Sequence, residues 1–197
     1  MNTTPTKTRP RGAARREALL EAVLEIVADV GADAVTHRRV AEVAELPLAS
    51  TTYWFSSKEH LLTAALELAA ERDIARLSAY TEQCSDDDPI EAAISLVIEP
   101  VEDRLRTSRG SLIATYTLLL EAARRPALRE ITARWTEEYL DAGSKLLERA
   151  GSTDPRGDAE LLVAAADGLL IEALSLGESA ELRPRLRRLA AALIGSP

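Results

Sequence analysis

Apolar residues recur every three to four positions along almost the whole chain, which is the spacing of one face of an α-helix. The first such stripe contains Leu20, Val23, Leu24 and Val27. Gly31 follows at a position where helices commonly end in a residue with positive φ. No segment of any length shows the strict alternation that is typical of strands, so the pattern predicts an all-α fold.

Two short helices are predicted directly after this first helix. Thr36 is a suitable N-cap for a helix over residues 37–44, and Pro47 suits the first turn of a second helix that ends at about Trp54. A closely connected pair of short helices, preceded by a longer one, is typical of the helix-turn-helix unit. In that unit the second short helix lies in the major groove of DNA and presents its polar side chains to the base edges.

The rest of the chain is predicted to form six more helices. Ser56 and Glu59 make a capping box that opens a long fourth helix. Pro100 is expected to kink or divide the fifth helix, because proline removes a backbone hydrogen bond. The fifth helix is expected to begin at Pro89. The sixth to ninth are expected to span residues 108–124, 126–150, 158–176 and about 180–194.

The composition supports this fold class and argues against several functional classes. Aromatic residues make up only 4% of the chain, so the core must consist mainly of aliphatic residues and alanine, among which Leu and Ala favour helices. The polar N-terminus has no apolar signal core and no run of 18 apolar residues occurs, which predicts a cytoplasmic protein that is not bound to a membrane. Cys84 has no second cysteine to pair with, and the only two histidines, His37 and His60, lie within residues 35–61. We therefore expect no metal site, no cofactor and no enzymatic activity.

Charge is unevenly distributed along the chain. The formal net charge is −8, and residues 1–60 carry eight basic and eight acidic side chains, so the whole acidic excess lies in residues 61–197. The first sixteen residues contain five basic side chains and no acidic one: Lys7, Arg9, Arg11, Arg15 and Arg16. We expect residues 1–12 to form a flexible basic tail that adds affinity for nucleic acid. The simpler alternative is a solvated tail without a function.

The two short helices carry side chains that suit the reading of DNA. Five apolar residues are expected to pack inward: Val40, Val43, Ala44, Leu46 and Phe55. Six residues are expected to face outward: Arg38, Leu48, Ala49, Thr52, Tyr53 and Trp54. Lys58, at the start of the fourth helix, can pair with a phosphate. The alternative is that these are two short helices of an ordinary bundle.

The segment 35–61, VTHRRVAEVAELPLASTTYWFSSKEHL, resembles the N-terminal signature of TetR-family transcriptional regulators. That signature combines Thr-x-Arg-x-Ile-Ala, a Gly-Val-Ser turn, a Thr-Leu-Tyr-x-x-Phe recognition helix and Lys-x-x-Leu. A second stretch, residues 119–126, is similar to one found in a branch of the family. The resemblance implies a three-helix DNA-binding domain over residues 13–58 and a larger helical domain for effector binding and dimerisation over residues 59–197.

The resemblance also implies which residues touch DNA. Together with the outward-facing residues above, this gives ten residues that are expected to contact bases or phosphates: Thr36, His37, Arg38, Leu48, Ala49, Ser50, Thr52, Tyr53, Trp54 and Lys58. The chain departs from the signature at several positions. Thr52 stands where the family has a tyrosine, Thr51 where a buried leucine is usual, and Pro47 replaces the capping serine. Glu45 replaces the turn glycine and is expected to be strained if the turn requires positive φ.

The predicted eighth helix is apolar almost all round, so it needs burial on two sides. The resemblance implies a homodimer in which this helix and the ninth form a four-helix bundle with their counterparts. The expected interface residues are Leu162, Ala165, Leu169, Ala173, Leu186, Leu189 and Leu193. The alternative is a helix buried within a single subunit.

Aromatic residues in the larger predicted domain are candidates for an effector pocket. The expected pocket residues are Leu66, Tyr116, Leu119, Trp135 and Tyr139, although aromatics at helical spacing are more often ordinary core. The resemblance implies a repressor that binds a palindromic operator in double-stranded DNA and is released by a small-molecule effector. The alternative function is that of a helical adaptor protein without operator binding.

Overall fold

The computed structural model describes residues 10–83, 88–176 and 182–194, and this part of the chain is helical with no strand. The elements in order are α1 (Pro10–Val30), the 3-10 turn η1 (Ala32–Ala34), α2 (His37–Val43), α3 (Leu48–Trp54), α4 (Lys58–Gln83), α5 (Pro89–Thr107), α6 (Arg109–Glu121), α7 (Pro126–Arg149), α8 (Pro155–Leu176) and α9 (Leu182–Ile194). The all-α prediction is confirmed. No helix in the described ranges is long and apolar enough to cross a membrane.

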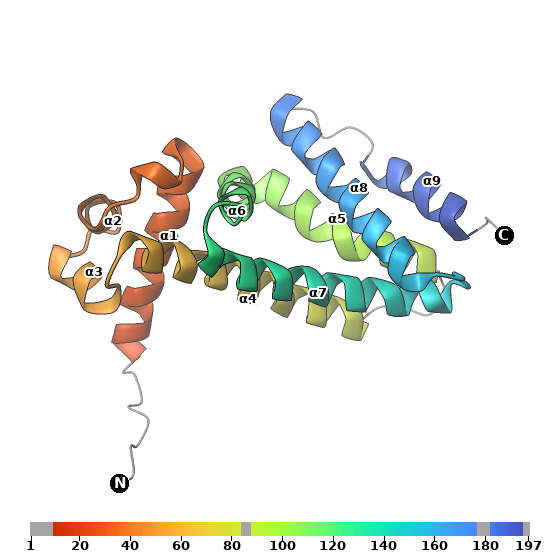
Figure 1. The fold of residues 1–197 in the computed structure, drawn as a ribbon, viewed down its shortest axis with the longest axis horizontal. Helices are drawn as coiled ribbons and strands as arrows, with labels where there is room; N and C mark the ends of the chain where they lie inside the picture. The colour runs from red at the N-terminus through yellow and green to blue at the C-terminus, as the bar shows by residue number, and fades with distance from the viewer. Residues whose placement is uncertain (1–9, 84–87, 177–181, 195–197) are drawn as a thin grey trace, which may run out of the picture.

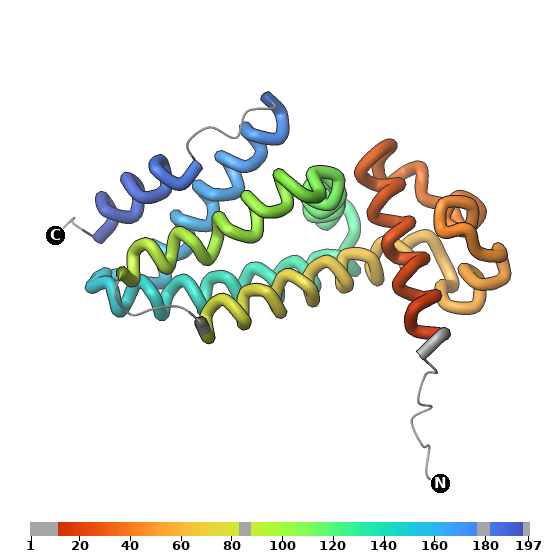
Figure 2. Tube along the Cα trace, turned by 180° about the vertical axis from the view of Figure 1, so that it is seen from behind, coloured from red at the N-terminus to blue at the C-terminus, as the bar shows by residue number. Residues whose placement is uncertain are grey.

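The helices form a small head and a larger body, which follow one another along the long axis of the molecule (Figure 1). The head consists of α1, α2 and α3. In the body α4 and α7 lie side by side, with α5 and α8 above them and α9 on the outside, as both views show (Figure 2). The helix α4 begins at the head and runs along the body, so it belongs to both parts. The head and the body are also joined through extensive packing of α1 against α6.

Two hydrophobic cores correspond to these two parts. The first contains the apolar faces of α1 and α4 together with residues of α6 and α7, including Phe55 and Leu66. The second lies between α5, α7, α8 and α9. At Gly110, α6 lies at an ordinary packing distance from α1, since a Cβ atom there would be 3.6 Å from the Cβ of Ala28. The head is therefore held to the body by a continuous core rather than by a loose connection.

Several helix ends differ from the sequence-based prediction. The helix α1 begins at Pro10, so residues 10–12 are helical and not part of a tail; residues 1–9 lie outside the described part of the chain. Ser57, rather than Ser56, caps α4, because its hydroxyl accepts a hydrogen bond from the backbone N–H of His60 at 3.1 Å. Pro100 does not divide α5, which continues through it to Thr107.

Candidate DNA interface and effector cavity

The helices α1 and α2 hold α3 so that one face of α3 remains open. The side chain of Thr36 accepts a hydrogen bond from the backbone N–H of Arg39 at 3.1 Å, which confirms it as the N-cap of α2. Phe55, the residue after α3, is buried in the same core as α1. Thr51 is also fully buried, and its hydroxyl donates to the carbonyl oxygen of Leu48 at 2.8 Å. The polar group at this inner position is therefore satisfied.

The open face of α3 carries four of the ten residues that were expected to contact DNA. Tyr53 is 78% exposed and Leu48 is 50% exposed, and both Ala49 and Thr52 are exposed as well. Trp54 differs from the prediction, because it is half-buried and packs against the core of the head. Its ring meets that of Tyr53 edge-on, with the centroids 5.0 Å apart. Trp54 therefore packs between the core and the ring of Tyr53 instead of facing outward.

The helix α2 carries two of the expected DNA-contact residues, and the turn after it carries one departure from the family signature. Arg38 is highly exposed and forms an ion pair with Glu42 one turn on, at 2.9 Å. The Nδ1 atom of His37 is buried without a hydrogen-bond partner in the described part of the chain. Glu45 has a φ of 52°, so the turn does require the left-handed conformation that a glycine adopts without strain.

Lys58 lies at the junction between the head and the body. Its Nζ atom donates to the carbonyl oxygen of Asp33 at 2.8 Å and lies 3.6 Å from the Oδ1 atom of the same residue. Arg125, from the loop after α6, lies 3.9 Å from that carboxylate. An ammonium group has three N–H donors, so a phosphate contact by Lys58 would use those that the junction leaves free.

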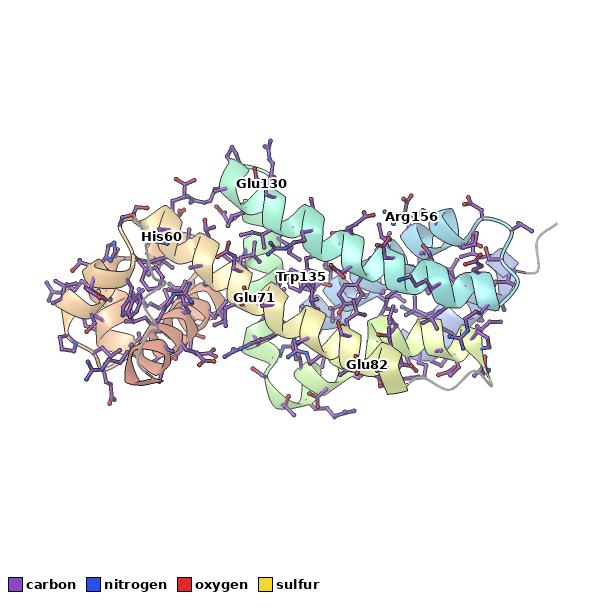
Figure 3. All side chains as sticks on the ribbon, turned by 90° about the horizontal axis from the view of Figure 1, so that it is seen from below. His60, Glu71, Glu82, Glu130, Trp135 and Arg156 are labelled. Carbon is purple, nitrogen blue, oxygen red and sulfur yellow. The ribbon has the colours of Figure 1, made fainter. Side chains whose placement is uncertain are left out.

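The body contains a cavity of about 100 Å³ between α4, α5, α6, α7 and α8. Thirteen residues line it: Asp73, Val97, Val101, Arg104, Thr115, Tyr116, Leu119, Trp135, Thr136, Tyr139, Val163, Ala166 and Asp167. Four of the five predicted pocket residues are among them. Leu66 is not, because it is buried in the first core next to the head, so its assignment to the pocket was wrong. Figure 3 shows Trp135 on α7, near the centre of the body and beside α4.

Asp73 of α4 is a buried carboxylate that the sequence analysis missed. It is only 2% exposed and accepts hydrogen bonds from Trp135 Nε1 at 3.1 Å and from the Tyr139 hydroxyl at 2.6 Å. It also pairs with Arg76 at 2.8 Å and with Arg104 at 3.2 Å. Burial and the neighbouring carboxylate of Asp73 raise the pKa of Tyr139 well above its usual value. The cluster keeps Tyr139 protonated and fixes both aromatic rings at the cavity wall.

The position of Asp73 in the sequence could have revealed it. It lies in the apolar stripe of α4, between Ala70 and Leu77, with which it shares three- and four-residue spacing. A carboxylate in such a stripe must find partners inside the protein, because an unpaired buried charge is too costly.

A second carboxylate, Asp167 of α8, also lines the cavity and is exposed to solvent. Its Oδ1 atom accepts a hydrogen bond from the Tyr116 hydroxyl at 2.6 Å. Burial raises the pKa of Asp167, and this effect exceeds the lowering by the hydrogen bond from Tyr116. Burial and the nearby carboxylate also raise the pKa of Tyr116, so the phenol stays protonated as the donor.

The residue next to Asp73 on α4 connects the body to the head. Arg72 pairs with Glu17 of α1 at 2.7 Å and also with Glu21, one turn further along α1. Neighbouring residues of a helix point about 100° apart. Arg72 therefore holds the head while Asp73 faces the cavity.

The exposed face of α8 differs from the predicted dimer interface. Leu162, Ala173 and Leu186 are buried within the protomer's own core, so they are not available to a second subunit. The other predicted residues, Ala165, Leu169, Leu189 and Leu193, are half-buried. The apolar residues that α8 leaves exposed are Leu161, Ala164, Gly168, Ile171 and Leu176.

The described residues hold no group of three or more His, Cys, Asp or Glu side chains that could bind a metal ion. This applies to the cavity as well, where the two carboxylates each bond to neighbouring side chains.

Comparison with known proteins agrees with the architecture. The family model described as the tetracyclin repressor-like C-terminal domain matches residues 86–196, more than half of the chain. A member of the TetR family from Streptomyces coelicolor A3, SCO1917, is 30% identical with a TM-score of 0.72, over 91% of this chain and 98% of that one. No curated protein sequence matches the chain significantly.

Two further structures resemble this one. The multidrug binding protein EbrR, in complex with ethidium, is 31% identical with a TM-score of 0.69, over 91% of this chain and 98% of EbrR. The SmeT–triclosan complex is similar in fold, with 21% identity and a TM-score of 0.72 over 91% of this chain and 90% of SmeT. With the helix-turn-helix head, the match of the family model and the identity to SCO1917, the chain belongs to the TetR family of DNA-binding transcriptional regulators.

Proposed function

We propose that the chain is a repressor that binds a palindromic operator as a homodimer and leaves it when a small molecule enters the cavity. The observation that carries this proposal is the course of α4. The helix begins at the head, where Lys58 bonds to Asp33, and contributes Asp73 to the cavity wall. The complex of EbrR with ethidium supports the assignment of a small-molecule ligand.

The open face of α3, together with Arg38 of α2, is the proposed surface for reading bases. Tyr53 and Leu48 are the large exposed side chains of α3, and small or hydroxyl side chains at Ala49 and Thr52 permit close approach to the base edges. Arg38 can exchange its exposed pair with Glu42 for a contact with DNA at little cost, since exposed ion pairs contribute little to stability.

The exposed apolar stripe of α8 is the proposed dimer interface. Leu161 is 53% exposed, Ile171 48% and Leu176 67%, which is unusual for large apolar residues that follow one helix face. A Cβ atom at Gly168 would meet nothing within 4 Å, so a partner helix could approach closely there. Pairing of two protomers through α8 would present two heads to two half-sites of one operator.

The proposed switch acts through the adjacent residues Arg72 and Asp73. A ligand that displaces side chains around Asp73 would shift α4, and Arg72 would transmit this shift to α1 through Glu17 and Glu21. The ligand must bind the released conformation more tightly, because equal affinity for both conformations shifts nothing.

Operator binding is the direct test of the proposed function. The operator is selected from a random DNA library with the purified protein, and affinity is then measured by fluorescence anisotropy. We expect Arg38→Ala and Tyr53→Ala to weaken binding about tenfold or more, because a base contact contributes about 1–3 kcal/mol. The matched control is Arg134→Ala, which removes an exposed arginine from α7. Selection of no preferred sequence, or equal affinity of all variants, would contradict the proposal.

The proposed dimer interface has a separate test. Sedimentation velocity is expected to show a dimer for the parent and a folded monomer for Ile171→Glu, because the substitution places unpaired charges in the interface. Leu48→Glu is the control, since Leu48 is 50% exposed and lies on α3 in the head, away from α8 (Figure 1). An unchanged dimer in the Ile171→Glu variant would refute this interface.

A further inference from the structure

Three charged residues line the cavity, and two of them neutralise each other. The carboxylate of Asp73 lies 3.2 Å from Arg104 and 2.8 Å from Arg76. The remaining contact of Arg104 is also inside the protein, because its Nε atom donates to the carbonyl oxygen of Pro100 at 3.1 Å. These contacts use the Nε and one terminal nitrogen of Arg104, and the charge of Arg104 is offset by Asp73, so the wall offers an anionic ligand no unpaired cation.

Asp167 is the charged group of the wall that is left without a counter-ion. Its hydrogen bond comes from a neutral donor, the hydroxyl of Tyr116. No ion pair joins Asp167 to any arginine or lysine in the described part of the chain. Asp167 lines the cavity yet stays exposed to solvent, so a ligand can reach its carboxylate. Partial desolvation at this edge of the cavity raises its pKa, and no basic side chain lowers it. A cation in the cavity would be attracted to this accessible carboxylate, because no basic side chain competes for it in the described part of the chain.

The rest of the cavity wall suits an apolar body attached to such a cation. Trp135 and Tyr139 are fixed by their bonds to Asp73, and aromatic faces attract cations. Aliphatic side chains from Val97, Val101 and Val163 complete the wall. A volume of about 100 Å³ is below the range of roughly 300–1,000 Å³ for drug-sized ligands. It is closer to a cavity of about 150 Å³, which accepts a single benzene ring.

We propose that the cavity binds small organic cations, with the positive charge beside Asp167 and an apolar body of about one aromatic ring against Trp135 and Tyr139. Only the identification of this ligand as the effector depends on the proposed function. The binding preference itself is argued from the residues that line the cavity. Asp167 is then the residue that selects for charge, and Tyr116 orients its carboxylate.

Three probes with one benzene ring, similar size and different charge test this preference: benzylammonium, benzyl alcohol and benzoate. Isothermal titration calorimetry at pH 7 is expected to show benzylammonium binding about tenfold more tightly than benzyl alcohol, which corresponds to about 1.4 kcal/mol. Benzoate is expected to bind most weakly. In the Asp167→Asn variant the preference for benzylammonium should disappear, while the affinity for benzyl alcohol stays unchanged.

Two variants control for charge and for shape. Asp103→Asn removes an exposed carboxylate of α5 that lies 3.9 Å from Arg106, and it should leave the preference intact. Asp167→Glu keeps the charge and should keep the preference as well. Equal binding of the alcohol and the ammonium by the parent, no binding of the ammonium at millimolar concentration, or an unchanged preference in Asp167→Asn would overturn the proposal.

Operator affinity measured on the same samples separates this proposal from the proposed function. If the parent binds its operator but does not prefer the cation, the cation site alone is refuted. If the cation binds as expected but no operator is selected, the repressor function is refuted and the cation site stands.

Discussion

The carboxylate of Asp73 should be among the most costly side chains to remove from this protein. It is 2% exposed, forms ion pairs with Arg76 and Arg104, and accepts hydrogen bonds from Trp135 and Tyr139. In the Asp73→Leu variant, Arg104, whose side chain is only 12% exposed, keeps a buried charge without its partner. Breaking a buried ion pair in this way costs about 3–5 kcal/mol, and each orphaned donor costs about 1–3 kcal/mol.

These contributions are not additive, so we expect a loss of about 4 kcal/mol in the free energy of unfolding. For a chain of this length that corresponds to a decrease of roughly 8–16 °C in Tm. Urea unfolding followed by far-UV circular dichroism measures the loss, at one protein concentration for all variants because dimerisation adds to apparent stability. Asp103→Leu, at an exposed position of α5, should change the free energy by no more than about 0.5 kcal/mol.

A double-mutant cycle then tests the cause. Replacing both charges, in Asp73→Leu with Arg104→Met, should recover a large part of the loss, because two apolar side chains tolerate burial without partners. A loss below about 1 kcal/mol in Asp73→Leu, or a double variant as unstable as the sum of the two single ones, would refute the assignment of Asp73 and Arg104 as a buried pair.

Three more predictions follow from particular contacts. Arg72→Ala should speed hydrogen exchange in the first half of α1 and leave α8 unchanged, because it removes the ion pairs between α4 and α1; equal exchange would show that the pairs do not hold the head. Tyr116 and Tyr139 have raised pKa values in the folded protein, so the unfolded chain loses their protons at lower pH. The free energy of unfolding should therefore fall as the pH rises above about 10, which urea unfolding at pH 9–11 measures. A constant free energy in that range would contradict the burial of these tyrosines. Glu45→Gly should stabilise the protein by up to about 1 kcal/mol, since glycine adopts the observed φ without strain, whereas Glu42→Gly within α2 should cost about 1 kcal/mol.

Local features of the fold were predictable because they depend on residues close together in the sequence. Thr36 caps α2 as expected, and Asp88 caps α5 by accepting a hydrogen bond from the backbone N–H of Glu91. The strain at Glu45 also followed from its place in the turn between α2 and α3. Helix periodicity, capping and turn conformation are set within a few residues, so the all-α fold and the helix-turn-helix head were evident without a structure.

The cavity was predictable only in part. Tyr116, Leu119, Trp135 and Tyr139 were expected there as inward-facing residues, and they do line it. The buried charge of Asp73 was not expected, because all its partners except Arg76 come from α5 and α7, far along the chain. Periodicity identifies the inner face of a helix, but only tertiary packing decides which polar groups on that face meet a partner.

The dimer face of α8 shows the same limit most clearly. A helix that is apolar almost all round has no single apolar face, so its sequence does not distinguish the side that packs on its own subunit from the side left for another. Leu162 and Ala173 were assigned to the second subunit but are buried in the first, whereas Leu161 and Ile171 remain exposed. The sequence by itself determined that α8 needs two partners; the packing of α5, α7 and α9 against it decided which side each partner takes.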